Sequence, residues 1–197
     1  PAKGAREWAD AVGSVLVASL TITKLRWVAD NEPEAAARIA AICLPHDWLT
    51  WRLRGTGRLE DLTTDRSDAS GTGYFDAVSN EYRRDLLALA LRRAPEEASG
   101  IILPRVLGPH EVAGTGGRIT TAAGGDHDLT HLVLGPGCGD NAGAALGLGL
   151  APGQTSVSLG TSGVVAAVSA TPTHDASGLV TGFADATGAF LPLACTL

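Results

Sequence analysis

The chain contains no methionine and only three cysteines, Cys43, Cys138 and Cys195. Because the cysteines are odd in number and no pair has the spacing of a metal site, we expect free thiols in a reducing cytoplasm. The absence of methionine means that Pro1 is not expected to be a natural start. The apolar run before Leu197 has no terminating signal, so we expect a fragment of a longer protein.

Long apolar runs and basic clusters are also lacking. No stretch approaches the ~18 uninterrupted apolar residues that cross a bilayer, and no signal peptide is visible. The 15 lysines and arginines form no long run and the net charge is -6, so we expect neither nucleic acid nor a membrane as a partner. The 197 residues, 45% of them hydrophobic, are enough for one large domain or parts of two.

Apolar spacing and turn residues give a coarse order of elements that is typical of an α/β protein. Helices are expected first, then a polar loop, an exposed hairpin and a β-meander. The expected helices cover residues 2–20, 24–31, 33–40, 46–54 and 81–93, the loop covers 63–76, the exposed turn or hairpin covers 114–132, and the meander covers 164–195.

One carboxylate stands at a transition from glycines to a helix. Gly135, Gly137 and Gly139 allow a tight turn, and residues 141–150 then read as a short helix of small residues. Asp140 is therefore expected at or near the N-cap, where its carboxylate can accept bonds from free N–H groups. On this stretch alone, capping is the favoured role.

A second turn of small residues follows. Residues 156–169 (SVSLGTSGVVAAVS) place two apolar runs around Gly160-Thr161-Ser162-Gly163, which predicts a β-hairpin. Its backbone N–H groups and hydroxyls could form an anion-binding nest. An ordinary hairpin turn remains the alternative on this stretch alone.

Together, GPGCGDN, the small-residue helix and SLGTSG resemble the centre of the FGGY family of carbohydrate kinases, and within it the xylulokinases. The resemblance implies that Asp140 is the general base that takes the proton from the sugar hydroxyl. Asn141 would orient that aspartate or the sugar. Gly160, Thr161, Ser162 and Gly163 would line the site of the ATP phosphates.

Further stretches are similar to the same family, in the family's order. They are Ser19 to Asn31, the pattern LPHDWLTWRLRG, the stretch TTDRSDASGTGYFD and the connector LPRVLGP. The resemblance makes His46 and Asp47 structural. It places the third stretch beside the sugar and the interdomain cleft, which makes Asp65 a candidate sugar-binding residue. The segment before Asp140 is shorter than the family pattern.

The family's fold is a pair of ribonuclease-H-like (actin-like) α/β domains. By this resemblance, residues 1–152 are the remainder of the N-terminal, sugar-side domain and 153–197 open the C-terminal, nucleotide-side domain. The implied reaction moves the γ-phosphate of ATP, with Mg²⁺, to the terminal hydroxyl of D-xylulose. The family's first phosphate loop would precede Pro1 and its adenine pocket would follow Leu197, so the piece alone is expected to be inactive. A homodimer of the full-length protein is left open.

Other interpretations remain at this point. The sugar could be ribulose, gluconate, glycerol or an autoinducer, or the chain could be a non-catalytic α/β binding module. A dinucleotide-binding domain is weakly supported, because the glycines before Asp140 lack the third-glycine spacing. A metal at His127 and His131 has no obvious third ligand, so no metal site is expected.

Overall fold

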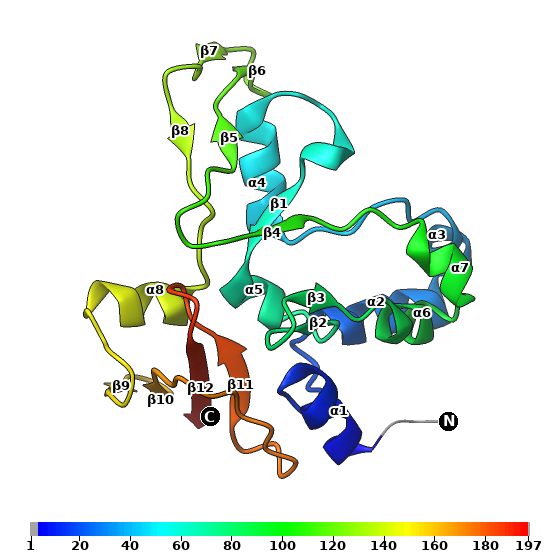
Figure 1. Cartoon of the computed structure of the whole chain (residues 1–197). Coiled ribbons are helices and arrows are strands. Elements are labelled where there is room, and N and C mark those ends of the chain that lie inside the picture. The colour runs from blue at the N-terminus through cyan, green and yellow to red at the C-terminus, as the bar shows by residue number, and fades with distance from the viewer. Residues whose placement is uncertain (1–3, 197) are drawn as a thin grey trace. The chain divides into compact units, whose positions relative to one another are not determined.

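The computed structural model describes residues 4–196. They form two compact units, each of helices and short strands (Figure 1). The first unit comprises Pro1–Arg38, Arg66–Ser99 and Cys138–Leu197, and the second comprises Ile39–Asp65 and Gly100–Gly137.

Helices make up most of the first two segments of unit 1. Leu86, Leu87 and Leu91 are buried on one helix, and this apolar side packs against a second helix that buries Ile22. A stripe of apolar residues facing the core is what holds such short helices in place. The helices are α1 (Ala5–Val12), α2 (Thr21–Asn31), α3 (Pro33–Ala37), α5 (Arg66–Ser70), α6 (Arg84–Leu91) and α7 (Pro95–Ser99), and α2 also contacts α3 (Figure 1).

Three of the expected helices were too long, and the one expected over 33–40 ends at Ala37. The helix expected over 2–20 ends at Val12, because Gly13 adopts a left-handed conformation with φ 77°; residues 2 and 3 lie outside the described range. A Cβ at Gly13 would stand 2.7 Å from the Gly182 carbonyl oxygen, so only glycine fits there. The helix expected over 81–93 is instead strand β3 (Glu81–Tyr82) followed by α6.

The expectation of a loop over 63–76 was wrong. Thr63–Asp65 form strand β1 of unit 2, and the next residues form α5 and then strand β2 (Phe75–Asp76), which pairs with β3. The hydroxyls that suggested a loop satisfy backbone groups in a buried position. Ser70 Oγ donates to the Ser67 carbonyl at 2.6 Å and accepts the Ala184 N–H at 2.9 Å.

Unit 1 ends in a four-stranded antiparallel sheet with the order β11-β12-β10-β9. A plain meander was expected, in which each strand pairs with the next one in the chain. This expected strand order was wrong, because β12 lies between β10 and β11. The sheet core, with Ala166, Leu191 and Leu193, packs against Ala142 and Ala145 of α8 (Asp140–Gly147). The strands are β9 (Thr155–Leu159), β10 (Gly163–Ala167), β11 (Thr181–Ala184) and β12 (Phe190–Thr196).

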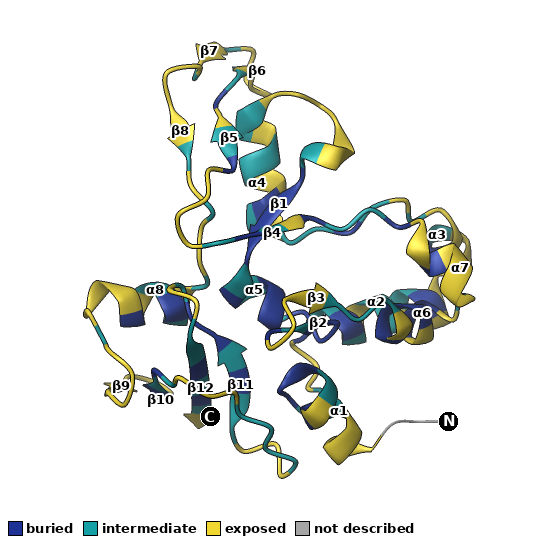
Figure 2. Ribbon diagram, viewed as in Figure 1, coloured by how far each residue is buried: buried dark blue, intermediate teal, exposed yellow. Residues whose placement is uncertain are grey.

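Unit 2 is built on α4 (Pro45–Arg54), which contacts β1. β1 pairs in parallel with β4 (Arg105–Leu107), and a single 3₁₀ turn, Leu59–Asp61, precedes β1. The expected exposed hairpin over 114–132 is present: β5 (Gly114–Thr115) pairs with β8 (Val133–Leu134), and β6 (Arg118–Thr120) pairs with β7 (Asp126–Asp128) (Figure 2). Within residues 4–196, no helix has the length and apolar character needed to cross a membrane.

The compact units follow a different division from the expected domains. Residues 138–197 cluster with the helices of unit 1, whereas the expected boundary lies between residues 152 and 153. The expected division rests on the family's domain arrangement, and it stays a prediction.

Asp185 and Asp175 each accept several hydrogen bonds from the turn that follows them, but Asp185 is more deeply buried. Asp185 is 3% exposed, and its carboxylate accepts the N–H groups of Thr187, Gly188 and Ala189 and the Thr187 hydroxyl. We predict that Asp185→Ala lowers the free energy of unfolding by about 2–4 kcal/mol, because several hydrogen bonds to a buried and charged acceptor are lost. Urea unfolding measures this. The matched control is Asp175→Ala, at a more exposed turn, and an equal loss in both variants would contradict the prediction.

Asp175 should also make stability depend on pH. Bonds from the Ser177 hydroxyl and then the Val180 N–H lower the pKa of Asp175 to about 2, whereas an unfolded aspartate titrates near ~3.9. A depressed folded pKa stabilises above the unfolded value, and this contribution is lost as the pH falls through the folded pKa. The difference in urea midpoint between the wild type and Asp175→Ala should therefore narrow between about pH 4 and about pH 2. A difference in urea midpoint that stays constant over this pH range would contradict the lowered pKa of Asp175.

Candidate active site

Asp140 is the first residue of α8, and its side chain is exposed. The N-cap itself is Gly139, which offers no side-chain bond, so Asp140 lies next to the N-cap, in agreement with the expected position at or near it. Its Oδ1 accepts the backbone N–H of Asn141 at 2.8 Å and the Asn141 Nδ2 at 3.2 Å. A carboxylate in the first helical turn is stabilised by the positive end of the helix dipole.

The start of α8 is held by α5. The Gly139 N–H donates to Ser67 Oγ at 2.9 Å, and a Cβ at Gly139 would lie 3.2 Å from Asp68 Oδ1. A side chain at position 139 would therefore press on Asp68. The glycine before the acid is needed so that α5 and α8 can approach each other this closely.

A cavity of about 130 Å³ opens beside Asp140. All of its lining residues belong to unit 1, and they include polar residues, two carboxylates among them, and apolar residues. It is smaller than a typical pocket for a whole ligand, which runs ~300–1,000 Å³, so it suits one end of a small molecule. The lining residues are Ser67, Asp68, Gly71, Gly139, Asp140, Asn141, Ala142, Phe183, Ala184 and Leu191.

A larger cavity of about 610 Å³ lies among α1, α2 and α6. Its lining includes Trp8, Ile22 and Leu89 together with arginines, but none of the described residues that line it is an aspartate, a glutamate, a histidine or a cysteine. Size alone therefore does not locate the chemistry, and the smaller cavity is the candidate active site.

The turn expected to hold phosphate joins β9 to β10, which pair in antiparallel register. Gly160, Thr161 and Ser162 are exposed and Gly163 is half-buried. The Gly160 N–H donates to the Ser162 carbonyl at 3.0 Å and the Gly163 N–H to Thr196 Oγ1 at 3.3 Å. Two of the four amides therefore have protein partners, and the phosphate-binding role of this turn stays a prediction.

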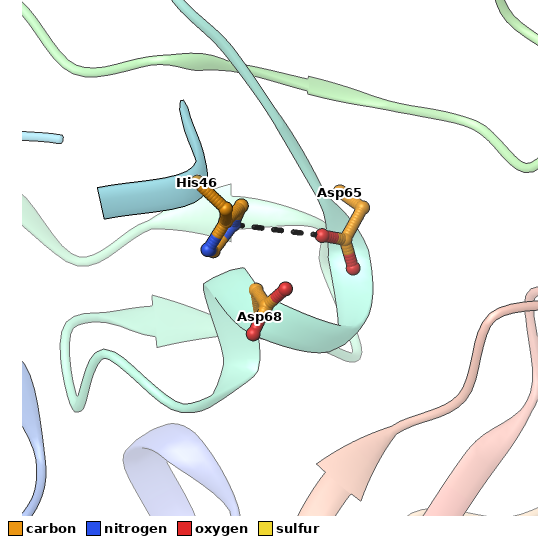
Figure 3. Close-up of side chains that lie close together, drawn as sticks. All are labelled: His46, Asp65 and Asp68. Carbon is orange, nitrogen blue, oxygen red and sulfur yellow. Dashed lines mark ion pairs between the residues drawn. The ribbon is translucent and has the colours of Figure 1, made fainter. Parts of the chain in front are cut away.

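Asp65, the other candidate for sugar binding, belongs to unit 2. It is buried at the end of β1, and its Oδ2 lies 3.9 Å from His46 Nε2. Figure 3 draws this pair, together with Asp68 of α5, which belongs to unit 1. The sugar-binding role of Asp65 stays a prediction.

Asp47 has the structural role expected of it. It is 1% exposed, and its Oδ2 accepts the Leu44 N–H at 2.7 Å at the start of α4. The two histidines considered for a metal do not share a helix, because His127 lies in β7 and His131 in a turn.

Residues 4–147 match the N-terminal domain of the FGGY family of carbohydrate kinases. This chain belongs to that family. It is 50% identical over 194 residues to a xylulose kinase of Streptomyces coelicolor, covering 98% of this chain and 37% of the relative. It is 32% identical over 188 residues to a xylulose kinase of Haemophilus influenzae, covering 94% of this chain and 36% of the relative. The chain thus spans little more than a third of these curated relatives.

Solved structures agree with the expected fold. The crystal structure of a xylulose kinase from Bifidobacterium adolescentis has a TM-score of 0.84 and 52% identity, covering 96% of this chain and 40% of that one. A glycerol kinase of Plasmodium falciparum with ADP, at 15% identity and a TM-score of 0.76 over 98% of this chain and 38% of that one, shares the fold. The prediction of an actin-like α/β fold is confirmed.

Most residues that line the cavity were not predicted as site residues from the sequence, Ser67, Asp68 and Phe183 among them. Ser67 and Asp68 lie in the stretch expected to be a loop, and Phe183 lies on β11. The signal for the first two was the resemblance of their stretch to a family segment beside the sugar. Nothing in the sequence indicated that Phe183 lines the cavity, because its position there depends on the order of the strands in the sheet.

Two glycines of the α8 region should respond oppositely to alanine. Gly139→Ala should lower the melting temperature, because its Cβ meets Asp68 Oδ1 at 3.2 Å and Ser67 Oγ at 3.6 Å. Gly147→Ala is the matched control, since a Cβ there meets nothing within 4 Å. It should stabilise by up to about 1 kcal/mol because alanine favours a helix. Thermal unfolding of both variants is the measurement, and a stabilised Gly139→Ala would contradict the close packing of α5 on α8.

The three thiols, none of which forms a disulfide, should differ in reactivity. Cys138 and Cys195 are exposed, whereas burial, and then the charge of Asp47, raise the pKa of the Cys43 thiol. Because the thiolate is the nucleophile, iodoacetamide near pH 8 should label the first two well before Cys43. Peptide mass mapping over time measures the order. The urea-unfolded chain is the control, where the three rates should converge; Cys43 reacting as fast as Cys138 in the folded chain would count against this order.

Proposed function

We propose that the full-length protein containing this chain transfers the γ-phosphate of ATP to the 5-hydroxyl of D-xylulose. The observation that carries the proposal is the exposed carboxylate of Asp140 at the start of α8, open to a small cavity and bonded to Asn141. Membership of a carbohydrate kinase family and the likeness to proteins named xylulose kinases supply the reaction class and the sugar.

The chemistry needs a base at the acceptor hydroxyl. In the proposed reaction, a carboxylate oxygen of Asp140 takes the proton of the 5-hydroxyl. The hydroxyl oxygen of the sugar then bonds to the γ-phosphorus as the bond from that phosphorus to ADP breaks. The Asn141 amide donates to Oδ1 at 3.2 Å, which leaves Oδ2 of Asp140 to face the sugar. Proton removal and in-line placement are the contributions of this part of the chain.

The nucleotide side of the proposal rests on the turn from Gly160 to Gly163. The exposed hydroxyls of Thr161 and Ser162 can donate to phosphate oxygens, as can backbone amides in a nest. Mg²⁺ would accompany ATP and neutralise charge on its phosphates, and we assign it no ligand in this chain. A cytoplasmic location belongs to the same proposal, because the three cysteines form no disulfide and thiols stay reduced in that compartment.

The sugar is the least constrained part of the proposal. Relatives named xylulose kinases favour D-xylulose, and another sugar or polyol of the same family is the alternative. A panel of xylulose, ribulose, gluconate and glycerol, with kcat/KM for each on the full-length protein, decides between them. A higher kcat/KM for any acceptor other than xylulose would make that acceptor the proposed substrate, and the proposed reaction class would stay the same.

Asp140→Asn in the full-length protein should lower kcat by about 10²–10⁴-fold, because a general base contributes that much. KM for the sugar should change little, since asparagine keeps the size of the side chain and an oxygen that can accept the Asn141 N–H. Steady-state phosphorylation of xylulose is the measurement. Asp126→Asn, which removes the same charge on the exposed strand β7, is the control and should retain normal turnover. A near-normal kcat in Asp140→Asn would show that Asp140 is not the general base.

A further inference from the structure

Arg66 is the first residue of α5, and its half-buried guanidinium bonds three partners. Nε donates to Asn80 Oδ1 at 2.7 Å, and Nη2 donates to the Ala77 carbonyl at 2.6 Å. Nη1 donates to the Ala189 carbonyl, and the guanidinium carbon lies 4.9 Å from the centre of the Phe190 ring. The three bonds leave from three different nitrogens, which among the side chains only a guanidinium offers.

These bonds join α5 to two other parts of unit 1. Ala77 and Asn80 belong to the turn between β2 and β3, and Ala189 directly precedes β12. Ala189 is 123 residues away from Arg66 in the chain. Arg66 therefore ties the first residue of α5 to the start of β12 and to the β2–β3 turn.

The other end of α5 is tied to the same sheet. Ser70 Oγ accepts the Ala184 N–H of β11 at 2.9 Å. Between the two ends of α5, Ser67 Oγ accepts the Gly139 N–H at the start of α8. Because both ends of α5 are fixed, the position of Ser67 is fixed too, and with it the place where α8 begins.

Arg66 also fixes a strand that contributes to the cavity. Ala189 and Phe190, its partners at the start of β12, lead directly into Leu191, which is 1% exposed and lines the cavity together with Asp140. Arg66 itself is not among the described residues that line this cavity. One side chain therefore holds a lining strand and, through α5, the helix that carries the acid.

We propose that Arg66 is a positioning residue, which holds α5 and β12 so that the Asp140 carboxylate stands at the reacting hydroxyl. The inference rests on the proposed function. A misplacement of about 1 Å in a reacting group can cost ~10²-fold in rate. Loss of the Arg66 bonds should therefore reduce kcat through Asp140, and it should change KM much less.

The test is a kinetic double-mutant cycle in the full-length protein, with wild type, Arg66→Ala, Asp140→Asn and the double variant. Arg66→Ala should lower kcat for D-xylulose about 10- to 100-fold, with less than about a threefold change in KM. In the Asp140→Asn background the same substitution should lower kcat less than about threefold, because residues that act as a unit are not additive. Each rate is divided by the folded fraction, which circular dichroism measures at the assay temperature.

Arg84→Ala is the matched control. Arg84 is also half-buried at the start of a helix, and its Nη1 donates to the carbonyls of Ala98 and Ser99 at 3.3 and 3.2 Å. It joins α6 to α7, and it is not among the described residues that line the cavity. Arg84→Ala should lower the melting temperature and keep kcat normal.

A second variant keeps the test valid if Arg66→Ala does not fold. Arg66→Lys keeps the positive charge and an apolar stem, but its ammonium replaces the fork of donors by a single point. It should show the same pattern as Arg66→Ala with a smaller loss of kcat. The double variant is then made with lysine.

The remaining outcomes overturn the inference. A normal kcat in the folded Arg66 variants would limit the Arg66 bonds to stability, and a raised KM with normal kcat would limit them to binding. An equal loss of kcat with aspartate and with asparagine at position 140 would make Arg66 independent of the base. Wild-type protein that phosphorylates no sugar would overturn the proposed function and this inference with it, whereas normal wild-type turnover with independent losses overturns only the role of Arg66.

Discussion

The hydrogen bond from the Gly139 N–H to Ser67 Oγ is the contact on which the site depends. It joins two segments 72 residues apart in the chain and sets where α8 begins. Because the first residue of α8 is the acid, the same bond sets where that carboxylate stands. A hydroxyl is well suited to this task, since it satisfies one of the unpaired N–H groups at a helix start without adding charge beside the acid.

The sequence was most informative where a local rule decides the structure. The helix predicted over 46–54 is α4, which begins at Pro45 and is followed by the left-handed Gly55, and the glycines before Asp140 mark the start of α8. These features depend on backbone conformations that only a few residue types adopt. The family resemblance then supplied the actin-like fold, which short-range patterns alone do not specify.

The expectations failed where distant contacts outweigh local preference. Hydroxyl-rich residues near Ser70 read as a loop, yet their hydroxyls bond backbone groups, including the Ala184 N–H, and let the segment be buried. The strand order of the sheet and the place of Phe183 in the cavity depend on pairing between segments far apart in the chain. Such pairing leaves no mark in any one stretch of sequence.

The insertion of β12 between β10 and β11 has a consequence for synthesis on the ribosome. The β9–β10 hairpin can close as soon as both strands emerge, but β11 has no sheet neighbour until β12 arrives. Leu191 of β12 contributes both to the core under α8 and to the wall of the cavity. A nascent chain that stops before residue 190 would therefore carry Asp140 without the part of its surroundings that β12 supplies, and the N-terminal end of α8 would reach its final packing late because its contacts span a long sequence separation.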